Sequence, residues 1–175
     1  MTTLSSDAIL DARAKKYAVL PDVSLNQDIF ATVVVLRIGT QHIGISSKNL
    51  ERIGRTPPIA HLPGLPSLLR GALQNRGELL AAVDTAKCFN IELKMENAFY
   101  AVVVHSSGRK LALLVDQVIG FRDIVKTDIV ESFLGNNRKG RRPIWAITRD
   151  LLEIVNVDAM FENKDIIAVP HASRH

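Results

Sequence analysis

The stretch VVVLRIGTQHIGI, residues 33–45, returns in the second half of the chain as AVVVHSSGRKLAL, residues 101–113. Each copy has an apolar segment rich in β-branched residues, a short polar segment with a glycine and a second alternating segment, which is typical of a β-hairpin. The same offset of 68 residues places Leu50 and Ile53 on Val118 and Phe121. This internal repeat predicts two similar β lobes.

A second match joins later parts of the two halves at an offset of 72 residues: Leu79, Leu80, Val83 and Phe89 fall on Leu151, Leu152, Val155 and Phe161. In both copies a polar residue, Asp84 or Asn156, ends the last strand, and a brief helical turn is expected to follow. We interpret these side chains as N-caps, because they can accept hydrogen bonds from the free amides of the turn.

The chain is expected to be mainly β, because short apolar segments alternate with turns that contain glycine, serine or asparagine. The expected strands are residues 32–38, 42–46, 78–83, 99–105, 110–115 and 151–157. No long amphipathic helix follows each strand, so a barrel or sandwich is favoured over a parallel sheet. A short N-terminal helix is expected from Ser6 or Asp7 to Tyr17, before Pro21.

Composition limits the environment of the protein. With 175 residues, of which 47% are hydrophobic, the chain can bury a core without a metal or a disulfide. Its one cysteine, Cys88, can form no internal bridge, and the N-terminus lacks an apolar segment of signal-peptide length. We therefore expect a cytoplasmic protein with no direct membrane insertion.

The positive charge raises an alternative function, a basic β-barrel that binds nucleic acid. The formal net charge is +4, and Arg138, Lys139, Arg141 and Arg142 cluster among glycines and asparagines. We interpret this cluster as a solvated loop, because no aromatic residues interleave with it as base stacking would require. A nucleic-acid partner is therefore not expected.

No group of residues predicts catalysis. Ser107 and Lys110 have the spacing of a nucleophile and an amine base, but the segment also reads as an ordinary hairpin turn. Asp116 follows an apolar strand, where an acidic side chain commonly closes a turn by bonding nearby amides. The five histidines are scattered without ligand spacing. We expect no enzyme activity, no metal and no cofactor.

Residues 62–77, LPGLPSLLRGALQNRG, suggest a functional surface. The prolines make residues 62–66 extended or turning, because each fixes its own φ and restricts the residue before it. Arg76 has two interpretations: a solvated turn residue before a glycine with positive φ, or a fork of donors for a partner's carboxylates or carbonyls. Spacing alone favours neither.

The same region resembles the signature of the CheW-like coupling proteins of bacterial chemosensory systems. The matching positions are Leu62-Pro63, Pro66, Gly71, Arg76-Gly77 and Asp84. Residues 113–118, LLVDQV, resemble the family's second marker, and residues 152–158, LEIVNVD, resemble its closing strand. The resemblance covers residues 30–163 and leaves residues 1–29 as an N-terminal appendage and 164–175 as a C-terminal tail.

The resemblance implies two intertwined five-stranded SH3-like β-barrels around a shared apolar core, without catalysis. Members of the family are adaptors. One surface binds the regulatory domain of a CheA-type histidine kinase, and another binds the cytoplasmic tip of a methyl-accepting chemoreceptor. The protein would then be cytoplasmic and recruited to membrane-associated receptor arrays.

The resemblance also implies a set of partner-binding residues: Leu50, Arg52, Ile53, Asn75, Arg76 and Gly77. Leu50 matches an apolar, receptor-facing position, and Arg76 is expected at the seam between the lobes. Arg52 stands where the family often has an acid, and Gln74-Asn75 stands where it often has Asn-Leu. These departures favour an alternative chemosensory pathway, of the gliding or twitching type.

Overall fold

The computed structural model describes residues 28–92, 99–132 and 143–167. The expected N-terminal helix and the basic cluster of residues 138–142 lie outside these ranges. The elements are, in chain order, β1 (Ile29–Ile38), β2 (Gln41–Ser46), η1 (Ser47–Asn49), β3 (Leu50–Arg55), β4 (Ile59–Ala60), β5 (Leu69–Asn75), β6 (Glu78–Asp84), α2 (Thr85–Cys88), β7 (Tyr100–Ser106), β8 (Arg109–Val115), β9 (Gln117–Val125), η2 (Lys126–Asp128), β10 (Ile129–Ser132), β11 (Ile144–Thr148), β12 (Glu153–Val155), α3 (Val157–Glu162) and α4 (Lys164–Ile167).

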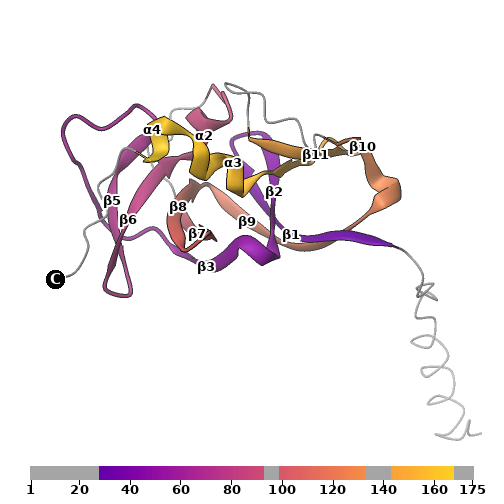
Figure 1. Ribbon diagram of the computed structural model, residues 1–175, viewed down its shortest axis with the longest axis horizontal. Coiled ribbons are helices and arrows are strands. Elements are labelled where there is room, and N and C mark those ends of the chain that lie inside the picture. Colours follow the sequence, from indigo (N-terminus) through magenta and orange to yellow (C-terminus); the bar gives the residue numbers. More distant parts are fainter. Residues whose placement is uncertain (1–27, 93–98, 133–142, 168–175) are drawn as a thin grey trace, which may run out of the picture.

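The described strands form two sheets, which we call lobe A and lobe B. Lobe A has the strand order β10-β11-β12-β2-β1-β9, and lobe B has the order β3-β7-β8-β6-β5-β4. In Figure 1 the β5–β6 hairpin lies at one end of the molecule, β10 and β11 lie at the other, and α3 and α4 lie above the region between them. The mainly β fold class is confirmed.

The internal repeat is visible in the strand pairing. The β1–β2 and β7–β8 hairpins are equivalent, and each pairs in parallel with a later or earlier strand, β2 with β12 and β8 with β6. The strand after each hairpin crosses to the other lobe: β3 pairs with β7, and β9 pairs with β1. This exchange of strands makes the lobes intertwined.

Each sheet has six strands in the described ranges, where five were expected. The added edge strands are short, two residues in β4 and four in β10. The expected strand at residues 151–157 is only three residues long, because Leu151 has φ +63° in a turn and Asn156 already caps α3. The caps themselves are confirmed: Asp84 accepts from the amide of Lys87, and Asn156 accepts from that of Ala159.

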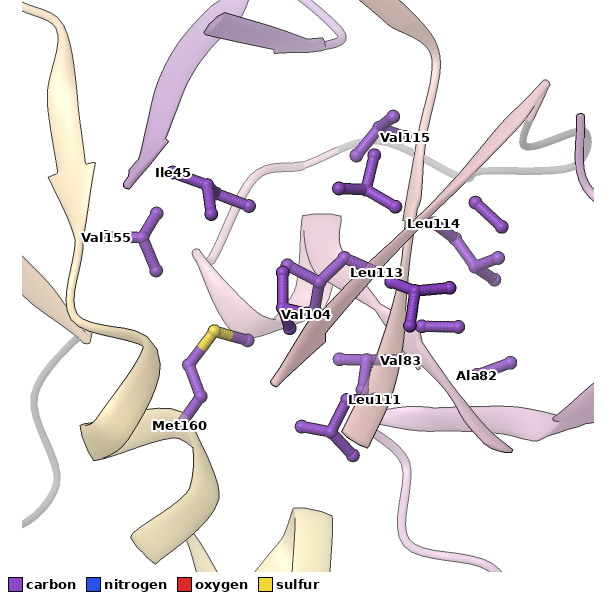
Figure 2. Close-up of a cluster of buried hydrophobic side chains, with 14 of the residues drawn as sticks. Ile45, Ala82, Val83, Val104, Leu111, Leu113, Leu114, Val115, Val155 and Met160 are labelled. Atoms are coloured by element: carbon purple, nitrogen blue, oxygen red, sulfur yellow. The ribbon is translucent and has the colours of Figure 1, made fainter. Parts of the chain in front are cut away.

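One large apolar core joins the two lobes. Figure 2 shows Ile45 and Val155 of lobe A facing Val104 and Leu113 of lobe B, with Met160 of α3 beside them. The core also includes Ile166 of α4, a residue of the segment expected to be a tail. A smaller core inside lobe A includes Val33, Ile124, Ala146, Leu152 and Ile154. Because both lobes contribute to the larger core, neither lobe completes that core alone.

Candidate partner-binding surface

Arg76 and Gly77 form the turn between β5 and β6. Asn75 pairs with Glu78, so the loop has two residues, and both have positive φ, +48° at Arg76 and +86° at Gly77. Two positive φ values match a type I′ turn, whose twist fits a hairpin. The side chain of Arg76 is exposed. The backbone interpretation of Arg76 as a turn residue before a positive-φ glycine is therefore confirmed, and its side chain is available to a partner.

A hydrogen bond connects this turn with β3. Arg52 donates from Nη1 to Oδ1 of Asn75 over 2.8 Å, and Asn75 is only 6% exposed. β3 and β5 are separated by three strands in the order of lobe B, so the bond shows that the sheet curls strongly on itself. The expectation that Arg76 sits at the seam between the lobes is wrong, because its turn joins β5 and β6, which both belong to lobe B.

Lys110 of β8 bridges two carboxylates at the same end of lobe B. Its Nζ lies 3.2 Å from Glu51 of β3 and 2.8 Å from Glu78 of β6. The hydrogen bond to Glu78, followed by that to Glu51, raises the pKa of Lys110 above its ordinary value. Both acids near the turn are thus engaged by Lys110.

Leu50 and Ile53 lie on β3 and are half-buried against the larger core. Leu50 pairs with Val104, and a register shift follows at Glu51. β-bulges of this kind re-aim side chains on edge strands. The partly exposed edges of these two residues can therefore contribute apolar contact to a partner without leaving the core.

The equivalent strand in lobe A carries an apolar surface that sequence reasoning did not assign to the site. β9 has a register shift at the matching position, and Ile119 and Phe121 are 52% and 63% exposed. The repeat already placed Phe121 on Ile53, and this was the signal that could have found it.

The signature residues before the turn shape a shallow groove. Gly71 has φ +148°, and a Cβ at this position would lie far inside van der Waals contact with the carbonyl oxygen of Ala60. The groove beside it, of about 590 Å³, is lined mainly by residues of the 59–70 segment and by Lys87. Arg70 and Lys87 lie 3.7 and 3.8 Å from Asp84, which is 2% exposed. Arg70 and Lys87 were not predicted as site residues.

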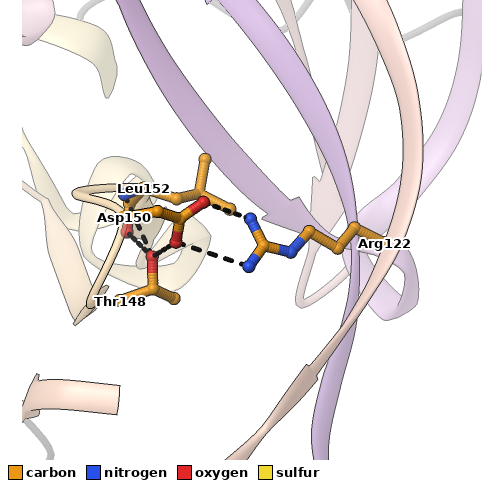
Figure 3. Close-up of polar contacts among 4 residues, drawn as sticks. All are labelled: Arg122, Thr148, Asp150 and Leu152. Atoms are coloured by element: carbon orange, nitrogen blue, oxygen red, sulfur yellow. Dashed lines mark hydrogen bonds and ion pairs between the residues drawn. The ribbon is translucent and has the colours of Figure 1, made fainter. Parts of the chain in front are cut away.

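The turn between β11 and β12 in lobe A corresponds to the Arg76 turn, and an ion pair holds it. Figure 3 shows Arg122 of β9 contacting Asp150, whose Oδ1 also accepts a 2.7 Å hydrogen bond from Thr148. The bond from Arg122, followed by that from Thr148, lowers the pKa of Asp150 from 3.8 to about 2. The same turn exposes Arg149 and Leu151.

The residues considered for catalysis have structural contacts. Ser107 lies in the β7–β8 turn with φ +48°, and Asp116 accepts a 2.5 Å hydrogen bond from the amide of Gly39. Among the residues that the structure describes, no group of histidine, cysteine and acidic side chains could hold a metal, and no helix is long and apolar enough to cross a membrane.

Comparison with known proteins places this fold in a family. A family model described as a CheW-like domain matches residues 32–165, most of the chain. The chain belongs to the CheW-like family. It is 25% identical over 146 residues to a probable chemotaxis protein CheW of Rhizobium etli, covering 81% of this chain and 94% of that relative.

Other CheW-like proteins show the same relationship. Protein FrzA of Myxococcus xanthus is 28% identical over 102 residues, covering 58% of this chain and 64% of FrzA. The crystal structure of the scaffolding protein TtCheW from Thermoanaerobacter tengcongensis superimposes with a TM-score of 0.65 at 19% identity, covering 77% of this chain and 94% of that one. This last likeness shows the shared fold. Nothing in these similarities supports the nucleic-acid alternative.

Proposed function

We propose that the protein is a non-enzymatic adaptor that couples chemoreceptors to a CheA-type histidine kinase in a bacterial chemosensory pathway. The observation that carries this proposal is the CheW-like match over residues 32–165. The names of the relatives, a chemotaxis protein and a scaffolding protein, support it. The adaptor unit is residues 30–163, and the protein acts in the cytoplasm at membrane-associated receptor arrays.

The proposed partners are the regulatory domain of the kinase and the cytoplasmic tip of a methyl-accepting receptor. Leu50 and Ile53 supply apolar contact from β3, and Arg76 supplies charged donors from its turn. Arginine is enriched among residues that dominate binding energy, and half-buried apolar residues need little reorganisation to bind. The departures at Arg52 and Asn75 favour a pathway other than that of swimming chemotaxis.

Reconstitution tests the adaptor function directly. Receptor cytoplasmic fragments and the CheA-type kinase of the source organism are mixed with and without the protein, and co-sedimentation of the kinase with the receptors is measured. We expect co-sedimentation only when the protein is present. Kinase that sediments equally well without it, or not at all with it, would contradict the adaptor function.

Two variants locate the surface. We expect Leu50→Asp to weaken receptor capture and Arg76→Glu to abolish capture of a partner, while both variants keep the circular dichroism spectrum of the folded protein. Melting should stay nearly unchanged for Arg76→Glu, which is exposed, and should fall for Leu50→Asp, because Leu50 packs against the larger core. The controls are Arg149→Glu, on the turn of lobe A that corresponds to the Arg76 turn, and Leu151→Asp, at an exposed leucine beside it. Unchanged capture by Leu50→Asp removes Leu50 from the surface, and unfolding of Arg76→Glu makes Arg76 a structural residue.

A further inference from the structure

We propose that Arg52 and Arg76 act together as a two-arginine site for an acidic segment of the receptor tip. The proposal rests on the proposed adaptor function and adds the chemistry of the partner at that surface. The hydrogen bond from Arg52 of β3 to Asn75 brings the Arg52 guanidinium to the residue that precedes Arg76 in the β5–β6 turn.

Both arginines adjoin Asn75, one through the chain and one through a hydrogen bond. Arg76 follows Asn75 directly in the chain, and the guanidinium of Arg52 lies 2.8 Å from the Asn75 amide oxygen. Asn75 is almost fully buried, whereas both arginines are exposed. The asparagine therefore fixes the position of the Arg52 head group while leaving it open to solvent.

Neither arginine is neutralised within the protein. Among the ion pairs of the described residues none includes Arg52 or Arg76, and the nearby acids Glu51 and Glu78 are both bound by Lys110. The three positive side chains, Arg52, Arg76 and Lys110, and the two carboxylates together carry a net charge of +1. The site thus offers positive charge that no neighbouring carboxylate balances.

The remaining donors of Arg52 suit a carboxylate. A guanidinium has five N–H groups, and in the described structure the bond from Nη1 to Asn75 accounts for one of them. Arginine binds carboxylates in a two-pronged geometry, and a head group already held in place loses less entropy on binding. A merely structural arginine would need only the bond to Asn75.

The position of Arg52 selects the receptor as the partner. Arg52 lies on β3 two residues after Leu50, the residue proposed to face the receptor, so one segment of a partner can cover both. That segment must combine an apolar side chain with one or two acidic ones. Charge complementarity of this kind fixes partner choice more than it fixes stability.

Neutralising variants of the full chain, titrated with the receptor cytoplasmic fragment by calorimetry, test the proposal. Arg52→Gln retains an amide donor for Asn75 and removes only the charge. We expect Arg52→Gln and Arg76→Gln each to weaken binding about tenfold, as for loss of a charge-assisted hydrogen bond. We also expect the double variant to depend much less on salt between 50 and 300 mM NaCl than the unmodified protein, because exposed charge pairs are screened.

The matched control is Arg55→Gln, on the same strand, whose guanidinium lies 5.3 Å from the ring centroid of Tyr100. It should change binding less than twofold. Asn75→Ala, which keeps both charges but frees Arg52, should weaken binding less than Arg52→Gln does.

The possible outcomes separate this proposal from the adaptor function. An unmodified protein that binds neither receptor nor kinase overturns the adaptor function itself. Normal binding with Arg52→Gln unaffected, or affected no more than Arg55→Gln, overturns the two-arginine site alone. A loss seen with the isolated kinase regulatory domain and not with the receptor overturns the assignment of the acidic segment to the receptor.

Discussion

Substitution of Gly71 by alanine tests how closely β4 and β5 must approach. A Cβ at residue 71 would overlap the carbonyl oxygen of Ala60 and lie 2.9 Å from Cγ2 of Ile59. These are β4 atoms, and Ala60 pairs with Ala72, so β4 must shift and its pairing with β5 must weaken. Gly71 also has φ +148°, a conformation that residues with a side chain rarely adopt.

The magnitude follows from these two contributions. The unfavourable backbone conformation costs about 1–2 kcal/mol, and overpacking costs about 1–3 kcal/mol. For a chain of 150–250 residues each kcal/mol lowers Tm by about 2–4 °C. At a combined cost of about 3.5 kcal/mol, we therefore expect Gly71→Ala to lower Tm by about 7–14 °C, measured by circular dichroism during heating.

Gly108→Ala separates the two contributions. Gly108 has φ +76° in the β7–β8 turn, but a Cβ there would meet no atom within 4 Å. It should carry the conformational cost without the overlap and lower Tm by about 3–6 °C. If Gly71→Ala destabilises the protein no more than Gly108→Ala, the close approach of β4 does not explain the glycine, and our account of this signature position is wrong.

Two further predictions concern stability. Asp150→Asn removes the ion pair with Arg122. On folding, the pKa of Asp150 falls from 3.8 to about 2. The ion pair therefore contributes its full stabilising free energy above pH 3.8, and this stabilisation is lost as the pH falls through about 2. Because the side chain of Asp150 is 55% exposed, we expect the substitution to lower the free energy of unfolding by only about 1 kcal/mol, measured by urea unfolding at pH 7. If the free energy of unfolding differs from that of the unmodified protein by the same amount at pH 3 as at pH 7, the ion-pair explanation is contradicted. Ile166→Ala should lower the free energy of unfolding by about 2–4 kcal/mol, because Ile166 is 2% exposed in the larger core, whereas Val130→Ala, at a residue 68% exposed, should cost under about 0.5 kcal/mol. A cost below about 1 kcal/mol for Ile166→Ala would show that α4 does not hold the core.

The hairpins were predictable because their buried faces are consistently apolar. Segments 33–45 and 101–113 begin with continuous apolar runs, as buried strands do, and their repetition predicted two lobes. β5 escaped prediction for the opposite reason. Its burial alternates over Leu69–Asn75, but two of its four buried positions are Gly71 and Asn75, one to admit the Ala60 carbonyl and one to accept from Arg52. The periodicity of apolar residues cannot reveal a buried face that contains a glycine and an asparagine.

β9 was missed because the middle of its exposed face is apolar. Ile119 and Phe121 point outward at alternate positions, so the sequence does not show the alternation of apolar and polar residues that predicts a strand. Pairing partners are also invisible to periodicity, which says that a strand exists and not which sheet receives it. The exchange of β3 and β9 between lobes therefore needed the structure.

The candidate site was predictable only in part. Arg76 was singled out as a possible partner-binding residue before any resemblance was considered, whereas Leu50 came from the resemblance to CheW-like proteins. The contact between Arg52 and Asn75 could not be found from sequence, because the residues are 23 positions apart on strands that are not neighbours in the sheet. It is the curl of lobe B that brings them together.

The exchange of edge strands has a mechanical consequence for an adaptor. β3, which carries Leu50 and Arg52, follows the β2 strand of lobe A in the chain but pairs with β7 of lobe B. Pulling β3 away from lobe B would therefore also disturb the lobe A hairpin that precedes it, and the reciprocal pairing of β9 with β1 has the same effect from the other side. Lobes tied in this way and joined by one core cannot swing as separate domains. This rigidity suits a protein that holds two partners in a fixed relative orientation. If the lobes moved freely, binding both partners would cost the entropy of fixing the lobes, and the coupling between the partners would be weaker.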